Sequence, residues 1–284
     1  ADFSFENEIQ VLEGVKRLVD FLPQSNTASP KIKHTDNYYN ERESLNRLIP
    51  SDKNEPYDMK ELILKIADEE DFLEVQKEYA NNIIIGFLRL DGHTIGVVAN
   101  QPMNLAGCLD INSSRKAARF VRFCDCFNIP ILTLVDVPGF LPGTSQEFNG
   151  IIKHGAKLLF AYAEATIPKV TLITKKAYGG AYDVMASKHL RGDLNYAWPS
   201  AEIAVMGAEG ASKILFKNSN DKNLQEQIIK YEKKFSNPYM AAARGYIDDI
   251  IIPSQTRSKI LTAFQLLRNK KISNPWKKHD NIPL

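Results

Sequence analysis

Two short, largely apolar segments, each followed by a helical pattern, constrain the fold of this chain most strongly. They span Ile131–Val135 and Pro168–Thr174, and such runs are typical of strands that are buried on both faces of a sheet. Helical patterns follow them at Phe148–Thr166 and Gly180–Ser187. A strand, helix, strand, helix order predicts an α/β fold with mostly parallel pairing.

The other expected elements follow from hydrophobic periodicity and from turn residues. Asp91-Gly92 lies between two β-branched runs, which predicts a hairpin. Ser113 or Ser114 is the expected N-cap of the helix that begins there. The remaining predicted helices cover residues 7–21, 59–67, 113–127, 211–216, 224–235 and 254–269, and the remaining predicted strands cover 72–75, 82–90, 94–99 and 202–206.

The 284 residues fit one large domain with an extended arm. We expect residues 1–57 to form a helix and an inter-domain arm, and residues 58–284 to form the domain itself. The segment Pro23–Asp58 is polar and irregular, so its packing partner is expected to lie outside this chain. The acidic N-terminus lacks the layout of a signal peptide.

Charge and cysteine content exclude several classes of protein. The formal net charge of +2 does not point to nucleic acid or to an anionic membrane, and no apolar run is long enough for a membrane span. The three cysteines, Cys108, Cys124 and Cys126, are an odd number. We therefore expect reduced and mostly buried thiols, rather than a disulfide framework or a metal site.

Three transitions from a strand to a loop are candidates for a ligand site, because ligands of α/β sheets bind at the carboxyl ends of strands. The first is the turn-rich segment after Asp136, which is either part of a site or a rigid connection. The second is the turn Gly179-Gly180-Ala181, and the third contains Gly207. The candidate residues of the first segment are Val137, Pro138, Gly139, Phe140 and Gly143.

The glycine turn has the composition of an oxyanion site. Gly179 and Gly180 let the backbone approach a ligand closely, and the helix expected from Gly180 begins with unpaired N–H groups. Such donors can hold an oxygen that becomes negatively charged. Gly207 is either a second close approach of backbone to ligand or a tight packing turn.

Side chains for acid–base chemistry are few near these turns. Asp136 is expected to cap its loop, while Asp183 lies in the first turn of a helix and is favoured there by the dipole. His154 and His189 are expected to make ordinary hydrogen bonds. No Ser-His-Asp order, His-Glu-x-x-His or phosphate-binding loop occurs, so the site is expected to use backbone electrostatics.

Long segments of the chain resemble the C-terminal carboxyltransferase domain of biotin-dependent acyl-CoA carboxylases, and among these the propionyl-CoA type. The resemblance extends from about Tyr57 to Leu284. It rests on VDVPGFLPGTSQEFNGIIKHGAKLLFAYAEATIPKVTLITKKAYGGAYDVMASKHL (135–190), NQPMNLAGCLDINSSRKAARFVRFCDCFNIP (100–130), GDLNYAWPSAEIAVMGAEGA (192–211) and PWKKHDNIPL (275–284).

The resemblance implies a crotonase/ClpP-like ββα superhelix. It also implies that the amides of Gly180 and Ala181 hold the ureido oxygen of biotin, and that Gly179 and Tyr182 help to form the pocket. Asp183 matches a position that bears on acyl-chain preference. The segment of residues 137–143 is implied to shape the biotin channel.

The same resemblance implies cofactor and partners. The cofactor is carboxybiotin, carried by a biotin carboxylase α subunit, without a metal, and CO2 passes to the α-carbon of propionyl-CoA, giving methylmalonyl-CoA. Six β subunits assemble, and active sites form between domains of different subunits. We expect the N-terminal, CoA-side domain to be absent here and the isolated chain to be inactive. The compartment is the bacterial cytoplasm or the mitochondrial matrix.

Two other functions stay open on sequence grounds. One is a biotin-dependent or crotonase-like acyl-CoA decarboxylase subunit, which would share the glycine turn. The other is a non-catalytic module for biotin docking and assembly.

Overall fold

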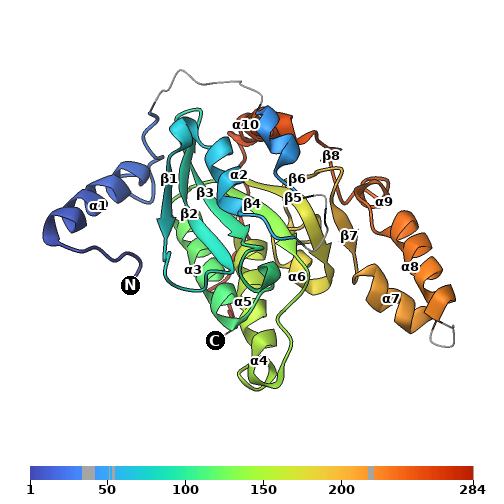
Figure 1. Ribbon diagram of the computed structural model, residues 1–284. Coiled ribbons are helices and arrows are strands. Elements are labelled where there is room, and N and C mark those ends of the chain that lie inside the picture. The colour runs from blue at the N-terminus through green and yellow to red at the C-terminus, as the bar shows by residue number, and fades with distance from the viewer. Residues whose placement is uncertain (34–41, 51, 53–54, 217–220, 284) are drawn as a thin grey trace.

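The computed structural model describes residues 1–284 except 34–41, 51, 53–54, 217–220 and 284. Within the described residues, eight strands form one mixed sheet with the order β1-β2-β3-β4-β5-β6-β8, and β7 pairs with β5 beyond this path (Figure 1). No helix of the described part has the length and apolar character needed to cross a bilayer.

The first three strands form the antiparallel side of the sheet. They are β1 (Phe72–Val75), β2 (Ile83–Leu90) and β3 (His93–Asn100). Asp91 and Gly92 connect β2 to β3 with φ values of 54° and 74°, the positive values that a two-residue primed turn requires. The predicted hairpin is therefore confirmed.

The parallel side contains the two apolar strands from which the α/β fold was predicted. These are β4 (Ile131–Val137) and β5 (Lys169–Tyr178), which runs four residues further than expected. The parallel side continues with β6 (Leu194–Ala197) and the two-residue β8 (Asp249–Ile250). Neither β6 nor β8 was predicted, because strands this short show little periodicity.

Helices cover both faces of the sheet (Figure 1). One core cluster includes buried residues of α3 (Ile111–Cys126) and α5 (Ile151–Glu164). The second includes buried residues of α2 (Met59–Ile66) and α10 (Thr256–Leu267). Two-sided burial explains why the residues of β4 are buried without alternation.

Two predictions about helix ends are wrong. The N-cap of α3 is Asp110, not Ser113 or Ser114: its carboxylate accepts from the Ser113 amide at 2.8 Å, and the Ser113 hydroxyl accepts from the Asp110 amide at 2.9 Å. This reciprocal capping box satisfies two backbone donors, which a lone serine cannot do. The helix predicted over residues 148–166 is α5, but it begins three residues later than predicted, after Gly150 with φ 84°, and the short helix α4 (Thr144–Phe148), which was not predicted, precedes it.

A third helix is shorter than predicted. The segment expected as Gly180–Ser187 forms only α6 (Gly179–Asp183). The helices towards the C-terminus include one, α9, that was not predicted, although Asn237-Pro238 is an N-cap signature. These C-terminal helices are α7 (Ala208–Leu215), α8 (Asp221–Phe235) and α9 (Pro238–Ala242). Short 3₁₀ turns of the described chain cover residues 43–47, 68–70, 105–107, 188–190 and 253–255.

The first helix, α1 (Glu8–Phe21), is confirmed with Asn7 as its N-cap. It extends to one side of the sheet (Figure 1) and is held at its last turn, where Phe21 is buried and lies under the Arg89 guanidinium at 4.2 Å. The apolar side chains further back on the helix are exposed. The expected arm overlaps residues outside the described set, and its role between domains stays a prediction.

Buried charges tie distant segments together. Arg257 of α10 forms an ion pair with Asp68 at 2.5 Å, and both side chains are almost completely buried. The Asp68 carboxylate also accepts from the Asp91 and Gly92 amides at 3.2 and 2.8 Å. One carboxylate therefore holds the hairpin turn against the C-terminal helix.

Three lysines, Lys116, Lys169 and Lys175, are also buried. The Lys169 ammonium donates to the carbonyls of Tyr162 and Ala165 at the end of α5, at 2.8 and 2.9 Å. Lys116 donates to the carbonyls of Tyr79 and Ile83 at 2.6 and 2.8 Å. The three cysteines are free as predicted, but the expectation that most of them are buried is wrong: Cys124 is buried, Cys108 is partly exposed and Cys126 is exposed.

Candidate functional site

The glycine turn lies where β5 ends and α6 begins. Gly179 has φ +54°, and a Cβ there would lie 2.8 Å from the Val205 carbonyl oxygen. Both facts restrict the position to glycine. A Cβ on Gly180 would meet nothing within 4 Å, so open space adjoins the backbone at that residue.

The amides that follow Gly179 lack partners within the helix. The first N–H groups of any helix have no intrahelical acceptor, and Tyr178, the N-cap of α6, makes no side-chain capping hydrogen bond. Because α6 has only five residues, its dipole is small. An electrostatic contribution of this turn would therefore come from individual first-turn N–H groups, and the assignment of this role to Gly180 and Ala181 stays a prediction.

Three strand ends meet at this edge of the sheet. Val137 of β4 pairs with Ala177 of β5, three residues before Gly180. On the other side of β5, Tyr178 pairs with Ala204 of β7 (Glu202–Ala204). The three transitions selected from the sequence thus leave the sheet at neighbouring positions, as expected for the carboxyl ends of parallel strands.

A pocket of about 530 Å³ opens beside the turn. The turn contributes one wall, β7 and Val205 a second, and the segment from α8 to the residues after α9 a third. Its lining residues are Gly179, Gly180, Tyr182, Asp183, His189, Ile203, Ala204, Val205, Tyr231, Phe235, Met240, Ala241, Arg244 and Tyr246. The mixture of aromatic walls and a few polar groups is typical of a small-molecule site.

Asp183 faces His189 inside this pocket. The carboxylate and the imidazole are 3.6 Å apart at Oδ1 and Nδ1, and both side chains are about half exposed. The His189 ring also packs on Tyr246, with 4.6 Å between ring centroids. Asp183 is thereby held at the pocket wall rather than turned into the protein.

The other predicted site residues lie around the pocket rather than in its lining. Ala181 is buried directly beneath the turn and does not line the pocket, so the role of its amide stays a prediction. Gly207 packs near the Tyr178 ring, 3.5 Å from where a Cβ would stand. This contact agrees with a tight packing turn, one of the two alternatives predicted for Gly207. A role of Gly207 in ligand binding stays a prediction.

The segment Val137, Pro138, Gly139, Phe140 and Gly143 takes a separate course after β4. The Gly139 carbonyl accepts from the Leu109 amide at 3.1 Å, and the Phe140 ring occupies the space beside Gly155 of α5. None of these five residues lines the pocket at the glycine turn. Their proposed part in a biotin channel therefore stays a prediction.

Asp136 connects β4 to β5 shortly before the glycine turn. Its carboxylate accepts from the Lys176 amide at 3.0 Å, at the irregularity where the register between β4 and β5 shifts, so it bridges two strands, and the expected loop cap stays a prediction. Burial raises the pKa of Asp136 and, with the nearby Asp136 charge, raises the pKa of Tyr57. The Tyr57 hydroxyl lies 2.7 Å from Thr174 Oγ1.

The sequence reasoning missed the third wall of the pocket. Tyr231, Arg244 and Tyr246 reach it from segments that lie more than forty residues beyond the turn. The positive φ of Gly245, 78°, marks the bend that brings Arg244 and Tyr246 together. The Arg244-Gly245-Tyr246 sequence after a short helix could have indicated this wall, but it matches no general motif for ligand binding or catalysis.

This geometry suits a ligand oxygen that gains negative charge. Open space adjoins the backbone at Gly180, and the nearest side chains contribute shape and charge but no activated nucleophile. His154 lies elsewhere, on α5, where burial and neighbouring cations, including Lys157, lower its pKa. The first-turn backbone and the charged side chains of Asp183 and Arg244 are therefore the electrostatic features of the pocket.

Comparison with protein families identifies one match over nearly the whole chain. Residues 1–282 match the model of the carboxyl transferase domain. The propionyl-CoA carboxylase beta chain of Cereibacter sphaeroides is 66% identical and matches all of this chain over 56% of its own length. The mitochondrial propionyl-CoA carboxylase beta chain of Sus scrofa is 54% identical over 99% of this chain and 52% of its own length. The chain thus spans about half the length of the curated relatives it matches.

Solved structures show the same relationship. A transcarboxylase 12S chain, from a hexamer with methylmalonyl-coenzyme A and methylmalonic acid bound, has a TM-score of 0.93 at 49% identity, covering 96% of this chain and 54% of that one. The β subunit of geranyl-CoA carboxylase from P. aeruginosa has a TM-score of 0.73 at 28% identity, over 97% and 54% of the two chains. The crotonase-like α/β class expected from the sequence is confirmed.

Proposed function

Because this chain belongs to the carboxyl transferase domain family, we propose that it forms the biotin-facing part of an acyl-CoA carboxyltransferase. The observation that carries the proposal is the open space beside Gly180, at the start of α6, in a pocket that Gly179 and Gly180 line. The relatives named above are carboxylases and a transcarboxylase, which favours carboxylation over the decarboxylase alternative.

The residues of the pocket fit the ureido ring of biotin. Open space adjoins Gly180, where the two amides would donate to the ureido oxygen, and the apolar and aromatic walls suit the ring and its alkyl chain. Carboxybiotin, carried by a partner subunit, would supply the CO2 and, after its loss, a basic ring nitrogen. Biotin dependence and the biotin-carrying partner are part of the proposal.

The contribution of this chain is electrostatic and positional. The amides of Gly180 and Ala181 stabilise the negative charge that develops on the oxygen they hold, an effect of about 3–4 kcal/mol per donor in other enzymes. Gly179 fixes the turn that points both amides to one place. Asp183, held beside His189, is placed where it would influence which acyl chain is accepted.

The acceptor proposed is propionyl-CoA, with methylmalonyl-CoA as product. It rests on the names of the relatives and on the methylmalonyl-coenzyme A bound in the transcarboxylase 12S structure. We further propose a β-subunit oligomer, by analogy with the hexamer of that structure. The compartment, bacterial cytoplasm or mitochondrial matrix, stays a prediction, since relatives of both origins are similar.

The proposal is tested by replacing Ala181 in the full-length protein. Ala181→Pro removes one N–H of the first turn, which has no intrahelical acceptor, and should lower kcat for propionyl-CoA carboxylation by about 10²–10³-fold. Ala181→Gly keeps the amide and is the matched control, for which kcat should stay within about tenfold of wild type. Normal kcat in a correctly folded Ala181→Pro protein would refute the oxyanion role.

A further inference from the structure

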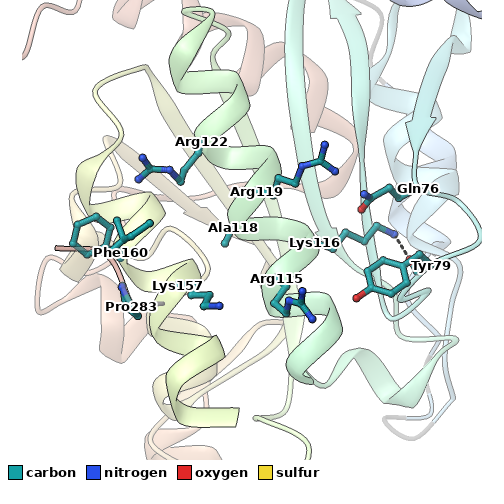
Figure 2. A pocket seen from close by; sticks show the side chains of 11 residues that line it. Gln76, Tyr79, Arg115, Lys116, Ala118, Arg119, Arg122, Lys157, Phe160 and Pro283 are labelled. Atoms are coloured by element: carbon teal, nitrogen blue, oxygen red, sulfur yellow. Dashed lines mark hydrogen bonds between the residues drawn. The ribbon is translucent and has the colours of Figure 1, made fainter. Parts of the chain in front are cut away.

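A second cavity, of about 470 Å³, lies between helices α3 and α5 (Figure 2). It shares no lining residue with the pocket at the glycine turn. The floor includes the small, buried Ala118, which lets the groove penetrate between the helices, and Phe160 forms an apolar wall. Residues Ile282 and Pro283 close one side.

The groove is lined by basic side chains from both helices. Arg115, Arg119 and Arg122 follow each other at intervals of four and three residues on α3, a spacing that places them on one side of a helix. Lys157 comes from α5, and Figure 2 shows Lys157 and Arg115 extending towards the space between the helices.

Only part of this charge is neutralised by described residues. Arg119 pairs with Asp2 at 2.9 Å, and Arg122 pairs with Glu164. For Arg115 and Lys157, the described part of the chain offers no carboxylate within ion-pair distance. Burial and then the neighbouring cations Arg115 and Lys153 lower the pKa of Lys157.

We propose that this groove is a binding site for a phosphate ester, with the phosphate between Arg115 and Lys157. A guanidinium fork and an ammonium on opposite walls match a phosphate dianion, which accepts several charge-assisted hydrogen bonds. The cavity is larger than inorganic phosphate requires, and Phe160 offers a surface for an organic part. The site is independent of carboxyl transfer at the glycine turn.

The test is a titration of the full-length protein with inorganic phosphate, inorganic pyrophosphate and ADP, followed by isothermal calorimetry at low salt. We expect saturable binding that weakens as NaCl rises. The double variant Arg115→Gln/Lys157→Gln should raise the Kd at least about tenfold. The matched control, Lys16→Gln/Lys230→Gln, removes two exposed charges from α1 and α8 and should bind as wild type does.

Each outcome decides the proposal. Tighter binding of ADP than of pyrophosphate supports a ligand with an organic part, and equal binding supports a site for the phosphate alone. The proposal is overturned if no probe binds, if the Arg115/Lys157 variant keeps wild-type affinity, or if the control loses as much affinity as that variant. A thermal melt of each variant separates loss of binding from loss of folding.

Discussion

Gly179 carries a conformational demand that no other residue type meets without strain. Its φ of +54° lies in the left-handed region, and the Val205 carbonyl oxygen occupies the place where a Cβ would have to go. The next residue, Gly180, has neither restriction. Two adjacent glycines therefore have different reasons to be glycine, and substitution distinguishes them.

We predict that Gly179→Ala destabilises the fold by about 1–3 kcal/mol, through the left-handed backbone and the short contact to Val205. Gly180→Ala should be neutral or stabilising by up to about 1 kcal/mol, because alanine is the better helix former. Urea unfolding of both variants provides the measurement. Equal stability of the two would mean that the turn does not impose the geometry described.

At the scale of the elements, Asp68 connects three segments that are distant in sequence. Its carboxylate binds Arg257 of α10 and the two amides of the β2–β3 turn. Removal of one partner from a buried pair leaves the other charge without compensation. The cost of such a loss is typically about 3–5 kcal/mol.

We therefore predict that Asp68→Ala lowers the free energy of unfolding by about 3–5 kcal/mol. Asp249→Ala is the matched control. It breaks the ion pair between Asp249 of β8 and Lys259 of α10, the helix that also carries Arg257, and both side chains of this pair are nearly half exposed. That loss should cost at most about 1 kcal/mol. The prediction fails if chemical denaturation gives similar losses for the two variants.

Elements whose signal is local were predictable from the sequence, and those fixed by tertiary contacts were not. Asp91-Gly92 specifies its hairpin through backbone conformation alone. By contrast, a glycine inside a helical pattern is usually tolerated, so Gly150 was not recognised as the residue after which α5 begins. The glycine turn was found because its own residues define it, whereas Arg244 and Tyr246 enter the pocket only through the packing of α8 and α9.

At the scale of the whole molecule, two buried ammonium groups make stability depend on pH. Burial lowers the pKa of Lys116 and of Lys169 from 10.5 to about 8. Between pH 8 and 10.5 the unfolded chain therefore binds more protons than the folded one, so this contribution to stability rises with pH. Below about pH 8 both states are protonated and the desolvation penalty is fully present.

We predict that the wild type gains stability relative to Lys169→Met between pH 7.5 and 9.5, on the order of 1–2 kcal/mol. The comparison cancels the titration of tyrosines and cysteines, which both proteins share. Lys16→Met, at an exposed position of α1, controls for the loss of a lysine. Urea unfolding at the two pH values gives the result, and a gap that is constant with pH would contradict it.

The isolated chain should also be inactive in carboxyl transfer. It spans about half the length of its relatives, and the acyl-CoA side of the reaction is expected on a different domain. We predict no decarboxylation of methylmalonyl-CoA above background by this chain with free biotin, measured by release of labelled CO2. Clear turnover would place the whole active site within these residues.

The order of the strands has a consequence for synthesis on the ribosome. From β1 to β6, each strand lies next to the one that precedes it in sequence, so the sheet can grow by addition at one edge as the chain emerges. Arg257, however, is made 189 residues after Asp68. During translation the Asp68 carboxylate therefore lacks its Arg257 partner until α10 has left the exit tunnel.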